Sequence, residues 1–523
     1  MYLLSLTNID YIFITIFFAI VFIIAYLFRH KNENSHEFLN GAIKQNAILN
    51  NQLIPIGLIE VVIAGIMGAT IGFVSLYYLI PIIVITNILK AQIAKLCLNA
   101  NVINLNEYII KQFGKVSGIC FALLNFGLIL SLLVITNLVI FELCQSILGW
   151  SFVNSIVGLL SMTLIYTLIG GSRGAFYNKV FFYFIILFML FGVIVVGIYQ
   201  IGGFNSLINN LSQLSGNQGY LFTHYTSMDL NGNLLVGVII SFIAIAAIEI
   251  INANHVTNTI LNVTTIWTSL IKIVVIVLLV MPGIIAIATP SDQATIPGKQ
   301  IVTIQAQFPD GEKGYVVKAV DNTKSGDNPI LGIIPPLLNS NNLIEKGQYN
   351  YSLANIVPFT HYFSKPLRFS LYMMLFALFM MGISQNLLLL ARNVLNGLLL
   401  PTNVIQKYGE IGELWAIRLT ILFGTLASAF IAYFFKNSFD LLAAIYLILS
   451  LFVAPLVAIS LLVINIKKAI SLLIPVLLTE IVTIFFIYLS HGDKSFYVQA
   501  KIIIVGFLVT YITGMISQLF IQK

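Results

Sequence analysis

The residues of this sequence that could carry chemistry begin with a carboxylate followed by closely spaced glycines. Glu60 lies in an apolar stretch, and Gly65, Gly68 and Gly72 follow it. Glycine weakens a helix, and backbone carbonyls released there can bind a cation or solute where they line a cavity. Glu60, Ala64, Gly65 and Gly68 are therefore candidate solute-binding residues. The alternative is close helix–helix contact, which small residues at this spacing also favour.

Glu60 ranks first among the ionisable residues that fall inside apolar stretches. Such a residue at membrane depth is expensive and marks a functional site by default. For a helix that begins near residue 53, Glu60 would lie about 10 Å along it, at about 1.5 Å per residue. The alternative is a polar crevice near the inner rim. Glu249, Lys272 and Glu480 rank lower. Glu249 lies close to a predicted span end, the depth of Lys272 depends on where its span begins, and Glu480 lies in an extra helix away from the glycines.

Several kinds of chemistry have no support in the sequence. The motifs GxxxxGK[ST], HExxH and GxSxG do not occur, and the six histidines do not cluster. The three cysteines form no CxxC pair, so neither a zinc site nor a disulfide framework is expected. We therefore expect no enzyme, no cofactor and no ATP-driven pump.

The composition is that of a membrane protein. Hydrophobic residues make up 59% of the chain and charged residues 9%, whereas soluble domains carry about 25% charged residues. We interpret the net charge of +7 as basic residues gathered in cytoplasmic loops. The expected partners are a small-molecule solute and membrane lipid, with a homo-oligomer left open and no nucleic acid.

Apolar runs long enough to cross a bilayer, about 20 residues each, predict an all-α polytopic protein with about thirteen transmembrane helices. The predicted spans are 10–28, 53–73, 74–95, 115–147, 150–170, 177–201, 232–252, 262–289, 366–399, 416–436, 440–464, 469–490 and 500–521. Lysine and arginine gather in alternate loops, which predicts the N-terminus outside and the C-terminus inside. Arg173 and Lys179 fall in one of the loops predicted to be cytoplasmic.

One long outer loop, 290–350, interrupts the apolar pattern. Its residues 303–308 and 314–319 alternate around a turn that contains ProAspGlyGlu, which predicts a β-hairpin. We expect an external decoration and no separate catalytic domain.

The stretch IYTLIGGSRGAFYNKVFFY at 165–183 resembles the YTxxGGxxAVxxTDxxQ motif of the sodium/solute symporter family. Other pieces that resemble this family follow in the family's order: EFLNG at 37–41, IGGF at 201–204, NIVPF at 355–359, KPLR at 365–368, FALFMMGISQNLL at 376–388, VAP at 453–455 and KK at 467–468. The resemblance runs from about 37 to 470.

This resemblance implies a LeuT-type fold within one transporter domain, 1–523. It implies two inverted five-helix repeats at 53–201 and 232–464, an extra N-terminal helix at 10–28 and extra C-terminal helices at 469–521. It also implies sodium-driven uptake of a small organic solute by alternating access. We expect the bacterial inner membrane as its location.

Two departures from the family put the coupling ion in question. The family's paired serines, which help to bind sodium, align with Met381 and Gly382, and Ser384, Gln385 and Asn386 supply the side-chain polarity nearby. A hard cation prefers oxygen ligands. A sodium ion, if one binds, is expected near Ala64 and Gly382, and Gln385 and Asn386 are candidate solute contacts.

The second departure replaces the family's Thr-Asp with Asn178 and Lys179. A lysine there would repel sodium, and a buried lysine shifts its pKa readily. One hypothesis is that Lys179 takes over the electrostatic role of the ion, so that transport is sodium-independent or proton-linked. The alternative is an ordinary basic residue at the cytoplasmic edge.

The sequence therefore favours a symporter coupled to sodium or protons. A degenerate, symporter-like sensor that binds solute without transporting it stays open as an alternative.

Overall fold

A computed structural model of the chain describes residues 7–29, 34–45, 57–102, 105–208, 258–288, 300–307, 313–320, 330–332, 358–359 and 369–436, with the single residues 481, 512 and 516. Within this part, seven helices are long and apolar enough to cross a membrane. The predicted spans 232–252, 440–464, 469–490 and 500–521 lie outside the described residues, apart from those single positions. The thirteen spans and the orientation of the termini stay predictions.

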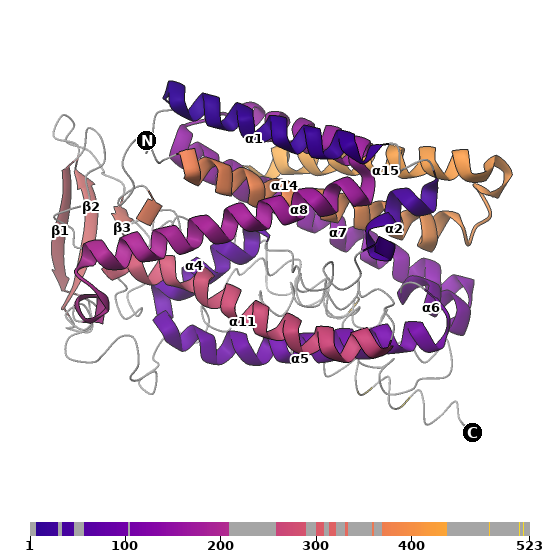
Figure 1. The fold of residues 1–523 in the computed structure, drawn as a ribbon, viewed down its shortest axis with the longest axis horizontal. Helices are drawn as coiled ribbons and strands as arrows, with labels where there is room; N and C mark the ends of the chain where they lie inside the picture. Colours follow the sequence, from indigo (N-terminus) through magenta and orange to yellow (C-terminus); the bar gives the residue numbers. More distant parts are fainter. Residues whose placement is uncertain are drawn as a thin grey trace.

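The described chain is a helical bundle with a small sheet at one end (Figure 1). In chain order the helices are α1 (Asn8–Leu27), α2 (Ser35–Gln45), α4 (Leu58–Ile71), the 3-10 turn η2 (Gly72–Val74), α5 (Ser75–Asn99), α6 (Leu105–Phe113), α7 (Lys115–Leu148), the π-helix η3 (Val153–Val157), α8 (Gly158–Ile201), α11 (Asn258–Ala288), α14 (Phe369–Asn393), the π-helix η7 (Val394–Leu399), the 3-10 turn η8 (Gln406–Tyr408) and α15 (Gly409–Phe435). The predicted spans that fall on described residues are confirmed as helices. The short helices α2 and α6 were not predicted.

The helices show why these residues fold in lipid. At the start of α1, the Asp10 carboxylate accepts from the Thr7 backbone N–H at 2.7 Å and the Thr7 hydroxyl accepts from Asp10 N–H, which is a capping box. On α15, Leu419, Phe423 and Phe430 are exposed, while the opposite face is buried. A helix that is apolar on its buried and its exposed face suits a hydrocarbon solvent.

The long helix α8 contains two segments. It has 44 residues, about 66 Å at 1.5 Å per residue, against a hydrocarbon core of about 30 Å. Gly171, at φ 54 and ψ −153, is the break, and glycine adopts this conformation without steric cost. Two spans were predicted here, 150–170 and 177–201. The connecting loop implied between them is wrong, because the helix resumes at Ser172, directly after the break.

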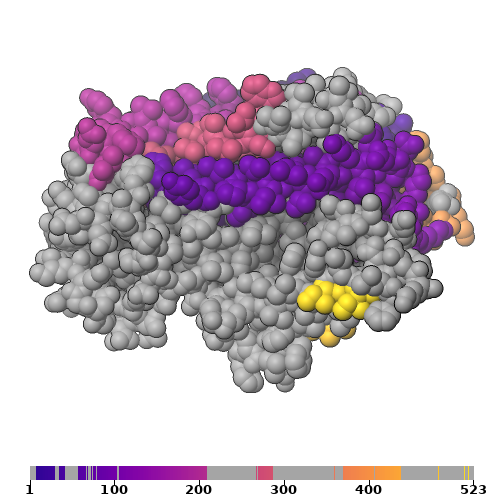
Figure 2. Space-filling view, turned by 90° about the horizontal axis from the view of Figure 1, so that it is seen from below, coloured from indigo at the N-terminus to yellow at the C-terminus, as the bar shows by residue number. Residues whose placement is uncertain are grey.

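The packing places several helices side by side. α8 contacts α1, α2 and α14, α7 contacts α14 and α15, and α11 lies along α4 and α5. In Figure 1 α4 and α11 both run towards the sheet, and α2 and α6 lie at the opposite end of the bundle. Figure 2 shows α5 as a long band on the lower face.

The sheet confirms the hairpin predicted within 290–350. Strand β1 (Gln300–Gln307) pairs antiparallel with β2 (Lys313–Val320), from Gln300 opposite Val320 to Gln307 opposite Lys313. Strand β3 (Ile330–Gly332) adds to the other edge of β2. The strands are slightly longer than the predicted ones.

Candidate functional site

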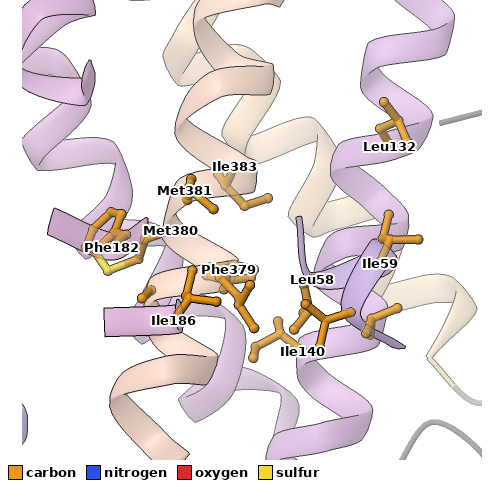
Figure 3. Close-up of a cluster of buried hydrophobic side chains, with 14 of the residues drawn as sticks. Leu58, Ile59, Leu132, Ile140, Phe182, Ile186, Phe379, Met380, Met381 and Ile383 are labelled. Carbon is orange, nitrogen blue, oxygen red and sulfur yellow. The ribbon is translucent and has the colours of Figure 1, made fainter. Parts of the chain in front are cut away.

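The candidate site begins where α4 starts inside the bundle. α4 has 14 residues, about 21 Å, which is too short to cross a core of about 30 Å. Gly57, which precedes it, is extended, at φ −81 and ψ 162. Figure 3 shows Leu58 and Ile59 of α4 in one apolar cluster with Ile140 of α7 and Phe379 of α14. The two segments that the sequence suggested as a solute site, on α4 and α14, are therefore neighbours.

Glu60 sits in the first turn of α4. A Cβ added at Gly57 would lie 2.1 Å from Oε2 of Glu60, so the carboxylate folds back over the start of the helix. Unpaired N–H groups and the positive end of the helix dipole favour a negative charge there. The predicted position of Glu60, counted from a helix that begins near residue 53, differs from this one because the described helix begins at Leu58.

The glycines of α4 have different roles. The helix continues through Gly65 and Gly68 and ends at Gly72, which has φ 59. A Cβ at Gly68 would lie 2.1 Å from the carbonyl oxygen of Val280 on α11. At Gly68 this supports the close-contact alternative of the sequence analysis. Ala64 is fully buried in the same helix.

On α14, the two aligned positions have different surroundings: Met381 is packed in the interior, whereas a Cβ at Gly382 would have no atom within 4 Å. Met381 and Ser384 are buried, whereas Gly382 and the neighbouring Gln385 and Asn386 are half-buried. The Ser384 hydroxyl donates to the carbonyl of Met381 at 3.2 Å, so its lone pairs remain the groups that it can offer to a cation.

Tyr166 was not singled out as a site residue, although it lies in the quoted 165–183 motif. Its buried hydroxyl donates to the carbonyl of Met380 at 2.8 Å. This bond fixes the first part of α8 against α14.

Asn178 and Lys179 lie in the second part of α8. Asn178 is fully buried and donates its side-chain N–H to the carbonyl of Val21 on α1 at 3.3 Å. Lys179 is also buried, with 7% exposed. Phe182, one turn further on, lies beside Met380 in Figure 3, so the two parts of the predicted ion-coupling set occur on neighbouring helices.

Among the lower-ranked ionisable residues, Lys272 is buried in α11. Glu249 and Glu480 lie outside the described residues.

A buried amide cluster that sequence analysis missed joins α6, α7 and α14. Asn106 and Asn125 both donate to Oδ1 of Asn393, Asn125 at 3.3 Å, and Nδ2 of Asn393 donates to the carbonyl of Ala122 at 2.7 Å. The π-helix η7 follows directly, and a Cβ at its Gly397 would lie 2.4 Å from Cβ of Ala122. The sequence signal that could have indicated this cluster was the presence of three asparagines near apolar runs.

Comparison with known proteins identifies a family that this chain resembles. The family model described as "Sodium:solute symporter family" matches residues 60–318. This segment, just under half of the chain, is therefore similar to the sodium:solute symporter family. The match and the apolar helices indicate a multi-pass membrane protein and point to a transporter rather than an enzyme.

One solved structure shares the fold of this chain. The structure described as the substrate-bound outward-open state of a Na⁺-coupled sialic acid symporter has a TM-score of 0.67 to this chain, with 12% identity and 98% of each chain covered. This likeness shows a shared transporter fold. A manganese transporter of Eremococcus coleocola covers 90% of this chain and 95% of its own at 13% identity, but its TM-score of 0.39 is too low to support an argument. No curated protein sequence matches the chain.

Proposed function

We propose that the protein is a sodium-coupled symporter that takes up a small organic solute by alternating access. The observation that carries this proposal is the short helix α4, which begins beside α14, in a chain whose residues 60–318 match the sodium:solute symporter family. Broken helices at the centre of such a fold are where transporters place solute and ion sites. The inverted repeats at 53–201 and 232–464 are part of the proposal.

The proposed solute site lies between α4 and α14. Glu60, Ala64 and Gly65 are its candidate residues on one side, with Gln385 and Asn386 on the other, whereas Gly68 is left out because it packs against Val280 of α11. The nearby cluster of Leu58, Ile140, Phe379 and their neighbours is apolar. Pockets that are mostly apolar with a few placed polar groups orient a solute through those groups. This favours a solute with an apolar part and few hydrogen-bonding groups.

The proposed sodium site lies near Ala64 and Gly382. Neither residue has a side-chain oxygen, so the ligands there would be backbone carbonyls together with the Ser384 hydroxyl, which still has lone pairs to offer. Sodium is a hard cation, and such oxygens suit it. The solved symporter of similar fold is described as Na⁺-coupled, which supports the same coupling here.

The burial of Lys179 favours a second candidate function. It lies eight residues after the break at Gly171, about 12 Å along the helix, and only 7% of it is exposed. A fixed positive charge there would do the electrostatic work of the ion, and uptake would then be independent of sodium or linked to protons.

Uptake into proteoliposomes separates these candidates. Radiolabelled nutrients are screened by counterflow, and the transported one is then measured with and without an inward sodium gradient. Sodium coupling predicts that accumulation collapses without the gradient and that Lys179→Ala leaves its sodium dependence unchanged. A fixed-charge role predicts uptake without sodium that Lys179→Ala abolishes, while the exposed control Lys407→Ala does not. If the protein binds a solute tightly but does not exchange it across the membrane, the sensor alternative replaces both transport candidates.

A further inference from the structure

The helix α2 is tied across the end of the bundle opposite the sheet. Glu37 of α2 forms an ion pair with Arg173, two residues after the break in α8. The Ser172 hydroxyl also donates to the carbonyl of Glu37, at 3.4 Å. The side chain of Arg173 is 11% exposed and that of Glu37 is 30% exposed, so the pair is partly shielded from solvent.

A glycine on α2 makes room for the arginine. Gly41 lies one turn after Glu37, on the same face of the helix. A Cβ at Gly41 would lie 2.7 Å from Nε and 3.1 Å from Cγ of Arg173, and 3.2 Å from Oε2 of Glu37. The guanidinium therefore lies directly across the backbone of α2, where a side chain would displace it.

Two further contacts hold α2 to other helices. Arg392, at the end of α14, donates to the carbonyl of Leu39 at 2.8 Å, and the Ser35 hydroxyl donates to Glu413 of α15 at 2.5 Å. Phe38 and Leu39, which belong to α2, have buried side chains. Detaching α2 would therefore expose apolar surface at this end of the bundle.

We propose that Glu37, Gly41 and Arg173 form a latch that keeps this end closed and opens when solute is released to the cytoplasm. The latch joins α2 to α8 next to its break at Gly171. α8 also carries Lys179, and α4, the next described helix after α2, carries Glu60. Such a contact holds α2 against α8 while the cytoplasmic end is closed. It must break before that end can open. This inference rests on the proposed alternating access and on the predicted orientation, in which Arg173 is cytoplasmic.

Cysteine accessibility tests the latch without any solute. In a full-length background without Cys97, Cys120 and Cys144, Leu39→Cys reports the exposure of the buried face of α2. A membrane-impermeant maleimide is added to inside-out vesicles. We expect slow labelling in this parent and about tenfold faster labelling after Arg173→Ala, a factor that corresponds to about 1.4 kcal/mol.

Further variants make the test specific. The charge exchange Glu37→Arg with Arg173→Glu should bring the rate back towards that of the parent, and Gly41→Ala should raise it with only one methyl added. The matched control is Lys407→Ala, which removes an exposed positive charge. Size-exclusion profiles identify variants that fail to fold, and Gly41→Ala then provides the test.

The proposal is overturned if folded Arg173→Ala and Gly41→Ala label no faster than Lys407→Ala. It is also overturned if the charge exchange labels as fast as Arg173→Ala. Labelling needs no transported solute, so it is independent of the uptake assay. If the variants label as expected but the protein shows no uptake, the proposed function is contradicted, while the latch between α2 and α8 is still supported.

Discussion

Replacing Asn393 with leucine removes the centre of the buried amide cluster. Asn393 is 3% exposed and makes three hydrogen bonds, to the side chains of Asn106 and Asn125 and to the carbonyl of Ala122. Leucine has a similar volume and can make none of them. Two amide groups and one carbonyl would then lose their partner in the interior.

The magnitude follows from the number of bonds. Hydrogen bonds between helices in membranes contribute about 0.6 kcal/mol each on average and at most about 1.7. Three of them give about 2 kcal/mol, and the desolvation of groups left unpaired adds to this. We therefore expect Asn393→Leu to lower the free energy of unfolding by about 2 kcal/mol.

The assay is equilibrium unfolding of the detergent-solubilised protein, followed by tryptophan fluorescence. The control is Thr402→Val, because Thr402 is exposed and its hydroxyl bonds only to carbonyls of its own chain segment. A double-mutant cycle with Asn106→Leu should show coupling, since the two residues share a bond. A loss for Asn393→Leu within about 0.5 kcal/mol of the control, the usual range of surface substitutions, would refute the reasoning.

Three further substitutions test the packing of the site helices by thermal unfolding. Gly68→Val should destabilise by about 1–3 kcal/mol, because overpacking displaces a backbone carbonyl of α11; the control Gly192→Val, where no atom lies within 4 Å, should change far less, and equal effects would contradict the close contact. Tyr166→Phe should cost about 1 kcal/mol through its lost bond to α14, whereas the same change at Tyr199, which is 83% exposed, should cost nothing; equal costs would argue against this bond. Gly171→Ala should destabilise by about 1–2 kcal/mol, because its positive φ strains any residue with a Cβ; an unchanged melting temperature would show that the break is not needed.

The spans could be predicted from the sequence because lipid imposes a simple rule on composition. The predicted span 115–147 corresponds to α7 (Lys115–Leu148), and the predicted span 74–95 corresponds to α5 (Ser75–Asn99). The short helices α2 and α6 contain polar residues and fall below any length rule for spanning. The sequence predicted a loop between the spans 150–170 and 177–201, whereas the helix is broken by the conformation of one residue, Gly171.

The site was predictable only as a set of segments. The glycines of α4 and the motif of α14 could be recognised, and the fold brings them together. The contacts that fix them join residues far apart in the chain, such as Glu37 with Arg173 and Asn106 with Asn393. No local pattern determines such pairings, because they depend on how helices pack. Whether Glu60, Gln385, Asn386 and Lys179 act in transport stays a prediction.

The most direct test of the central claim is accumulation of the transported solute in proteoliposomes under an imposed sodium gradient. The proposal predicts uptake above equilibrium with sodium outside and none when potassium replaces it on both sides. It also predicts that added solute drives sodium-22 into the vesicles. Solute accumulation that is equally strong without sodium, with no sodium-22 entry, would contradict sodium coupling.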